Sequence, residues 1–163
     1  MQLEGSCHCG AVRYRVRSRG PQPFAFCYCT ICRKTAGGSG ASVNLHADMD
    51  TLEVQGREHV GVYRPWMDHP ARTERSPGER HFCRECGTAL WVWDPRWPEL
   101  VHPHASAVDT PLPTPPERHH CMLTYKPDWV PVPQGPTEHP AAQYPQLESL
   151  EAWHRQHGLW QDP

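Results

Sequence analysis

The chain has 163 residues, enough for one domain with a modest core, and 37% of them are hydrophobic. A formal net charge of -2 argues against a general nucleic-acid binder and against an acidic tail. No charged segment followed by an apolar run opens the sequence, and no stretch approaches eighteen consecutive apolar residues, so neither a signal peptide nor a membrane span is expected. We therefore expect a cytoplasmic protein whose thiols stay reduced.

Short strands are predicted through the N-terminal half. Residues 11–18 alternate strictly, with Val12, Tyr14 and Val16 on one face and arginines on the other, which is typical of a half-buried strand. That arginine face is either solvated or a surface for an anion or RNA. Further strand-like segments are 24–26, 41–45, 51–54 and 59–64.

A short helical turn and a hairpin follow from local signals. Thr30 is the expected N-cap of a turn that carries Arg33 and Lys34 and stops at the glycines 37–38. Segments 80–83 and 88–93 form a hairpin through the Cys83–Cys86 turn. The last strands are expected at 100–108 and 120–125.

Proline dominates the C-terminal part, where fourteen of the nineteen prolines follow Trp93. The run 111–116 indicates an extended connector or a ligand for a proline-recognition domain. After an extended segment at 131–145, residues 146–157 suit a helix with Leu147, Leu150 and Trp153 on one face, stopped by Gly158. We expect residues 1–130 to form a zinc-binding domain and 131–163 to pack on it as an extension, which would bury the tail's tryptophans.

The eight cysteines indicate zinc. They occur as Cys7-x-Cys9, Cys27-x-Cys29-x-x-Cys32 and Cys83-x-x-Cys86, with Cys121 alone. Close pairs on tight turns direct two sulfurs to one point, as a metal site requires. Gly10 and Gly87 each follow a pair, where such a turn often needs positive φ. A disulfide framework is the alternative, which clustered thiols and the absence of an export signal disfavour.

The partition of the sulfurs bears on function. The two glycine-trailed pairs resemble each other, so Cys7, Cys9, Cys83 and Cys86 make a natural closed structural site. That leaves Cys27, Cys29 and Cys32 with an open fourth position, as catalytic zinc usually has. Alternatively, Cys121 or a histidine closes the second site. Cys121 is otherwise a buried small hydrophobe.

Three ordered motifs resemble those of the glutathione-dependent formaldehyde-activating family, which also includes centromere protein V. The first motif is Gly5-Ser6-Cys7-His8-Cys9-Gly10-Ala11-Val12. The second is Cys27-x-Cys29-x-x-Cys32-Arg33-Lys34 followed by Gly37. The third is Phe82-Cys83-x-x-Cys86-Gly87-Thr88-x-Leu90-Trp91. Weaker similarity continues through 107–109, 116–120, 126–129 and 153–159.

The resemblance implies a mainly β fold, with antiparallel sheets in a zinc-clamped "β-tent", short helices and a C-terminal helical tail. It also implies a structural zinc at Cys7, Cys9, Cys83 and Cys86 and an active zinc at Cys27, Cys29 and Cys32. One of His119 and His120 is then expected to border the pocket, whereas the other ten histidines share no ligand spacing and are interpreted as ordinary.

The chemistry of three thiolates suits the activity that the resemblance implies. A centre of one zinc ion and three thiolates has a net charge of -1, and it favours a bound thiolate over activated water. The expected function is a carbon–sulfur lyase or synthase that adds a thiol such as glutathione to a small aldehyde. Arg33 and Lys34 would offset charge or bind a carboxylate of the thiol; alternatively they are solvated. The alternative function is a non-catalytic zinc-scaffolded binding module.

Overall fold

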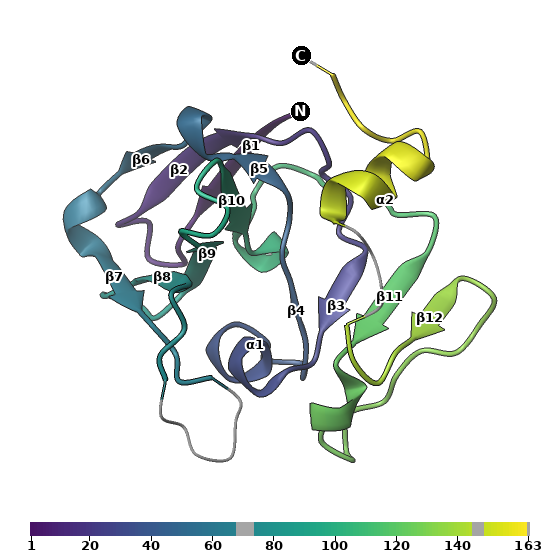
Figure 1. The fold of residues 1–163 in the computed structure, drawn as a ribbon. Helices are drawn as coiled ribbons and strands as arrows, with labels where there is room; N and C mark the ends of the chain where they lie inside the picture. The colour runs from purple at the N-terminus through teal and green to yellow at the C-terminus, as the bar shows by residue number, and fades with distance from the viewer. Residues whose placement is uncertain (68–73, 145–148, 163) are drawn as a thin grey trace.

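The computed structural model describes residues 1–67, 74–144 and 149–162 (Figure 1). It is mainly β, with three small sheets and two short α-helices in the described residues. Within them, no helix combines the length and apolarity needed to cross a membrane. The predicted mainly β class with antiparallel sheets is confirmed, and parallel pairing in one sheet is an addition to it.

The first sheet joins three antiparallel strands in the order β1 (Gln2–Ser6), β2 (Arg13–Arg17) and β6 (Glu53–Gln55). The alternation predicted for β2 is confirmed, since Tyr14 and Val16 are buried while the arginines between them face outward. Apolar side chains on one face of a pleated strand must be covered by another layer, and here the second sheet covers them.

The second sheet is the largest and is antiparallel throughout. Its order is β5 (Ala47–Asp48), β10 (Leu100–Pro103), β9 (Ala89–Trp93), β8 (Glu79–Cys83) and β7 (Val60–Tyr63). The predicted hairpin is confirmed as β8 and β9. The strand expected at 100–108 is shorter, because the chain turns into a 3-10 helix at Ala105–Ala107.

The third sheet mixes directions in the order β12 (Glu138–Pro140), β11 (Arg118–Cys121), β3 (Ala25–Cys27) and β4 (Ser42–Val43). β3 pairs antiparallel with β4, whereas β11 lies parallel to both β3 and β12. The strand expected at 120–125 is wrong in its bounds. Met122 takes a left-handed φ of 65°, which ends the strand and starts a 3-10 helix at Leu123–Tyr125.

The first helix, α1 (Thr30–Thr35), corrects the predicted cap. Thr30 is the first helical residue, and Cys29 is the N-cap because its Sγ accepts a hydrogen bond from Cys32 N at 3.3 Å. The helix ends before the glycines, since Ala36 has a φ of -147° and leaves the helical region. Other 3-10 turns occur at Met49–Thr51 and Arg57–His59.

The second helix, α2 (Leu150–Gln156), lies within the range expected for the tail. Residues 146–148 of that range, with Leu147, lie outside the described residues. Ser149 caps the helix by accepting a hydrogen bond from Ala152 N at 2.9 Å. Trp153 is 2% exposed and stacks on Phe24 with ring centroids 3.7 Å apart, so the helix packs against the start of β3.

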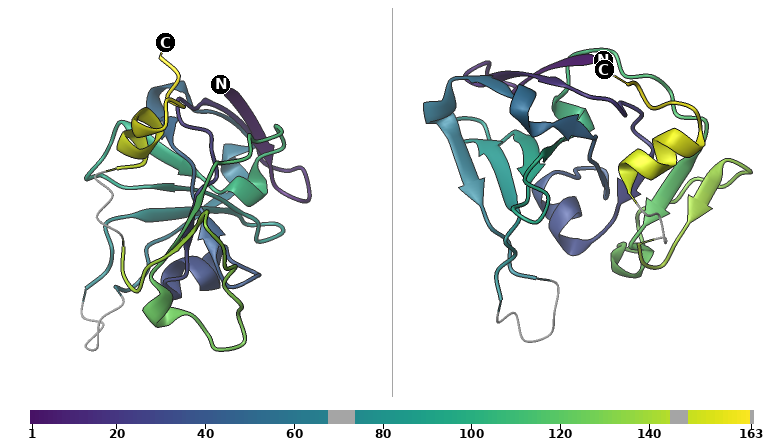
Figure 2. Two further views of the ribbon diagram at one scale, coloured as in Figure 1. Left: turned by 90° about the vertical axis from the view of Figure 1, so that its right-hand side faces the viewer. Right: turned by 45° about the horizontal axis from the view of Figure 1, so that its top comes forward.

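The main core lies between the first two sheets. Leu3, Val16, Leu90 and Val101 are fully buried there, and Tyr14 meets Trp91 edge to face at 5.4 Å. The helix α1 lies between the second and third sheets, and the two chain ends lie side by side (Figures 1 and 2). The second and third sheets thereby flank the segment that carries the three-cysteine motif.

Replacement of Trp153 by alanine tests whether residues 131–163 form one folding unit with the rest of the chain, as we propose. We expect a loss of about 3–5 kcal/mol in the free energy of unfolding, because a large buried aromatic is removed. Trp129→Ala is the matched control, since Trp129 is 71% exposed and its loss should change stability by less than about 0.5 kcal/mol. Urea unfolding measures both, and equal small effects would contradict a packed tail.

Buried histidines predict acid sensitivity. Burial lowers the pKa of His46 to about 4 and that of His104 to about 3, from an ordinary value of 6.5. Between these values and 6.5 the unfolded chain binds more protons, so stability is complete above pH 6.5 and falls as the pH falls. Replacing His104 by glutamine should reduce the stability lost between pH 7.5 and 5.0 by about 2 kcal/mol. Urea unfolding at the two pH values measures this loss in the wild type and in the variant, and an equal loss in both would contradict the assignment.

Candidate metal centres and the adjoining cavity

The first group of sulfurs joins the first and second sheets. Cys7 and Cys9 follow β1, and Cys83 and Cys86 form the turn after β8. All four sulfurs lie within 4.8 Å of one another, and Cys9 Sγ is 3.5 Å from Cys7 Sγ and 3.8 Å from Cys83 Sγ. Four sulfurs held about 2.3 Å from a tetrahedral zinc lie about 3.8 Å apart, so the spacing fits that ion.

The two turns of this group have the same construction. Cys7 N donates to Val12 O at 3.0 Å, and Cys83 N donates to Thr88 O at 2.9 Å. Gly10 and Gly87 close the turns with φ of 77° and 74°, as the sequence predicts. Because glycine alone adopts this conformation without a steric penalty, the backbone can reverse while both sulfurs of each pair face inward.

The second group is buried, and all three of its sulfurs lie within 4.8 Å of one another. Cys27 ends β3, Cys29 caps α1 and Cys32 lies within it, so strand, cap and helix each supply one sulfur. Hydrogen bonds from Cys29 and Cys32 lower the pKa of Cys27 to about 3, whereas the hydrogen bond to Cys27 raises the pKa of Cys32 well above its usual value. Three thiolates cannot ionise together so closely without a cation, and a zinc ion would supply that charge.

Tyr144 is a neighbour of this group that the sequence did not indicate. Its hydroxyl donates a hydrogen bond to Cys27 Sγ at 3.3 Å. The residue stands in the proline-rich segment between β12 and α2, with no cysteine motif beside it. The C-terminal extension therefore reaches the sulfurs directly.

Cys121 is close in the sheet but is not one of the three clustered sulfurs. It pairs with Cys27 in the β11–β3 register, and its sulfur lies 3.9 Å from His119 O. Burial raises the pKa of its thiol to about 12, which keeps it protonated at neutral pH. This geometry favours a buried small hydrophobe over a fourth ligand.

A cavity of about 510 Å³ opens beside the second group. Cys27, Cys29 and Cys32 line its wall, together with residues of the second and third sheets. Its volume falls within the range of small-molecule sites. Trp97, Val92 and Met122 give an apolar wall, and the polar side chains that face it include Asn44, Arg80, Asp94, Arg96, His102 and Tyr144.

Arg80 and Arg96 both bring positive charge to this cavity, but they differ in whether an acidic partner neutralises it. Arg96 is paired with Asp94 at 2.6 Å, so its charge is neutralised. Arg80 Nε is buried and has no hydrogen-bond partner among the described residues. A buried donor without a partner is rare and expensive, which makes Arg80 the group best suited to bind an anion.

Arg33 and Lys34 do not line this cavity. Both lie in the last turn of α1, and Lys34 borders a different hollow beside Tyr63 and Trp66. Arg33 Nε is buried and, like Arg80 Nε, has no hydrogen-bond partner among the described residues, so a role for Arg33 and Lys34 beside the cysteines stays a prediction. Neither His119 nor His120 lines the cavity either.

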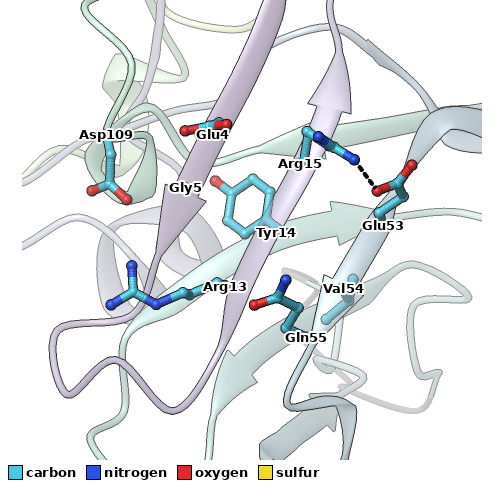
Figure 3. Close-up of a pocket in the computed structure, with 9 residues that line it drawn as sticks. All are labelled: Glu4, Gly5, Arg13, Tyr14, Arg15, Glu53, Val54, Gln55 and Asp109. Atoms are coloured by element: carbon cyan, nitrogen blue, oxygen red, sulfur yellow. Dashed lines mark hydrogen bonds and ion pairs between the residues drawn. The ribbon is translucent and has the colours of Figure 1, made fainter.

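A second hollow, of about 440 Å³, lies over the first sheet and is lined by no cysteine (Figure 3). Arg15 pairs there with Glu53 at 2.6 Å, as the dashed line in Figure 3 marks. Tyr14 donates to Ala107 O from the floor. Farther along β2, Arg17 is 3.0 Å from Asp48. Acidic partners on this strand face favour a solvated surface over one that binds an anion or RNA.

Comparisons with known proteins identify the family of the chain. The family model described as "Glutathione-dependent formaldehyde-activating enzyme" matches residues 2–123. A Halomonas elongata protein named "Putative glutathione-dependent formaldehyde-activating enzyme" is 58% identical over 159 residues, which cover 98% of each chain. A Rhodobacter sphaeroides protein of known crystal structure is 26% identical, with a TM-score of 0.51, and the match covers 69% of this chain and 92% of that one. The chain therefore belongs to the glutathione-dependent formaldehyde-activating enzyme family.

Proposed function

We propose that this protein is a zinc-dependent carbon–sulfur lyase that adds a thiol, with glutathione as the expected substrate, to formaldehyde or a similar small aldehyde. The observation that carries the proposal is the cavity lined by three buried, mutually close cysteines. Membership of the family supports the substrate class. The eight free cysteines fit a reducing compartment, and we propose the cytoplasm.

The two groups of sulfurs have different roles in this proposal. Cys7, Cys9, Cys83 and Cys86 would hold a structural zinc, since four ligands leave no open position. Cys27, Cys29 and Cys32 would hold the second zinc beside the cavity. A zinc ion bound by three thiolates would favour a substrate sulfur in its thiolate form.

The chain's own residues bind and orient the thiol. Arg80 offers its unpartnered Nε–H to a carboxylate, and glutathione carries two of these. Tyr144 fixes Cys27 by its hydrogen bond and so orients one ligand. The apolar wall with Trp97 and Val92 limits water around the carbonyl carbon.

His102 is the candidate acceptor of the thiol proton. Its Nδ1 lies 3.1 Å from Leu45 O, and a carbonyl only accepts, so Nδ1 carries the hydrogen and the neutral ring has its lone pair on Nε2. In the reaction the thiol S–H bond and the carbonyl π bond break, and an S–C bond forms. The proton taken up at His102 Nε2 then goes to the carbonyl oxygen, which completes the S-hydroxymethyl adduct.

Substitution of Cys29 by alanine tests the function of the second group. We expect the variant to lose one zinc per chain and the catalysed formation of the adduct, measured by plasma emission and by NMR exchange between formaldehyde and the adduct. Cys121→Ala is the matched control, because Cys121 lines the same cavity outside the cluster, and it should keep both. A Cys29→Ala enzyme with full activity would sink the lyase proposal. A single zinc that is indifferent to this substitution and to glutathione would instead indicate a zinc-scaffolded binding module.

Substitution of Arg80 by glutamine tests carboxylate recognition. A charge-assisted hydrogen bond contributes about 1.5–3 kcal/mol, so KM for glutathione should rise roughly 10–100-fold with little change in kcat. Arg84→Gln, an exposed arginine on the same hairpin, should leave KM unchanged. With 2-mercaptoethanol, a thiol that has no carboxylate, Arg80→Gln and the wild type should react equally. A KM defect that persists with this thiol would contradict the assignment.

A further inference from the structure

Outside the cysteine groups, the described residues include one more cluster of metal-ligating side chains, drawn from separate parts of the chain. Glu117 precedes β11, His119 lies in β11 and His139 lies in β12, and the two histidines are partners in the parallel register. One ligand atom from each lies within 4.8 Å of the other two. None of the three lines the cavity beside Cys27, so the cluster is separate from the proposed reaction.

Glu117 is the centre of this cluster. Its Oε1 lies 2.8 Å from His119 Nε2, and its Oε2 lies 3.0 Å from His139 Nε2. Trp153 Nε1 donates to Oε1 at 2.9 Å. Each oxygen of the carboxylate thus has a histidine nitrogen beside it, and a glutamate oxygen is a good metal ligand.

His157, the residue that follows α2, lies beside the Glu117 carboxylate. Its Nδ1 lies 2.8 Å from Trp153 O, and because a carbonyl only accepts, Nδ1 must carry the hydrogen. The neutral ring therefore has a lone pair on Nε2, which lies 3.3 Å from Glu117 Oε1. A neutral ring would set two acceptors opposite each other, so this contact needs either a proton on His157 or a metal ion.

We propose that Glu117, His119 and His139 form a third zinc site, of nitrogen and oxygen ligands, with His157 Nε2 as the fourth ligand. Two histidines and a glutamate are an established ligand set for zinc. Ligand atoms about 2.0–2.1 Å from a tetrahedral zinc lie roughly 3.4 Å apart. The three atoms of Glu117, His119 and His139, within 4.8 Å of one another, need only small adjustments, whereas His157 Nε2 lies 3.3 Å from Glu117 Oε1 but outside that group and must move toward the other two histidines.

The surroundings of the cluster also suit a metal. A ligating histidine usually donates its other ring N–H to a carbonyl or carboxylate, and His157 already does so. The Trp153 N–H holds the glutamate in the same way. An ion here would connect β11, β12 and α2, which lie next to one another in Figure 1, and would fix the C-terminal extension to the third sheet.

Cobalt titration of the metal-free protein distinguishes this site from the cysteine groups. Cobalt bound by cysteines gives strong thiolate-to-cobalt absorption, whereas cobalt bound by histidine and carboxylate does not. We expect the wild type to bind one equivalent of cobalt without thiolate absorption. His139→Gln and Glu117→Gln should lose that equivalent and keep the thiolate absorption. His59→Gln is the matched control, because His59 contacts Glu85 at 3.0 Å without a second histidine, and it should bind as the wild type does.

Equal cobalt binding by the wild type and both cluster variants would overturn the proposal and leave a protonated His157 as the cation. Nitrogen NMR of the wild type gives a readout that needs no variant. Without metal, His139 donates from Nε2 to Glu117, so zinc should move its hydrogen to Nδ1; an unchanged tautomer at saturating zinc would also overturn the proposal. Loss of the thiolate absorption in every variant would contradict the proposed cysteine sites, but it would not contradict the site at Glu117.

Discussion

Two groups of closely spaced sulfurs are the constraint on which the rest of this structure depends. Seven sulfurs lie in two groups whose members are within 4.8 Å of one another, and such groups cannot ionise fully without a cation among them. The first group lies where the turn after β1 meets the tip of the β8–β9 hairpin, so the zinc that we propose there would fix the first sheet to the second. Since the largest apolar core lies between these sheets, an ion at their edge and burial at their centre would support the same packing.

The second group is placed differently, and the difference explains how the fold supplies a reactive centre. Its sulfurs are confined to one short stretch, so they hold no two distant segments together themselves. Distant segments instead come to them: Arg80 from the second sheet, Cys121 from β11 and Tyr144 from the C-terminal extension. One wall of the cavity is thus the turn that carries Cys27, Cys29 and Cys32, and the other walls come from segments distant in sequence.

The motifs with short-range geometry could be predicted from the sequence. The alternation of β2, the β8–β9 hairpin and the glycines after Cys9 and Cys86 are properties of neighbouring residues. The cavity wall could not be predicted, because no local sequence pattern indicates that Arg80 and Tyr144 lie near Cys27. Arg33 and Lys34 follow Cys32 directly in sequence but do not line the cavity beside it, so spacing alone does not establish their role. The parallel pairing of β3 with β11 depends on contacts across the chain, which periodicity does not reveal.

That parallel pairing has a consequence for synthesis of the chain. Its first partners, Ala25 and His119, are separated by more than half of the sequence. Closing such a long loop is slow, and it must wait until β11 has left the ribosome. Cys27, Cys29 and Cys32 emerge early and remain uncovered through that interval, when an oxidant or a wrong metal can reach them. Early binding of an ion by these three cysteines would protect their thiols before the third sheet has formed.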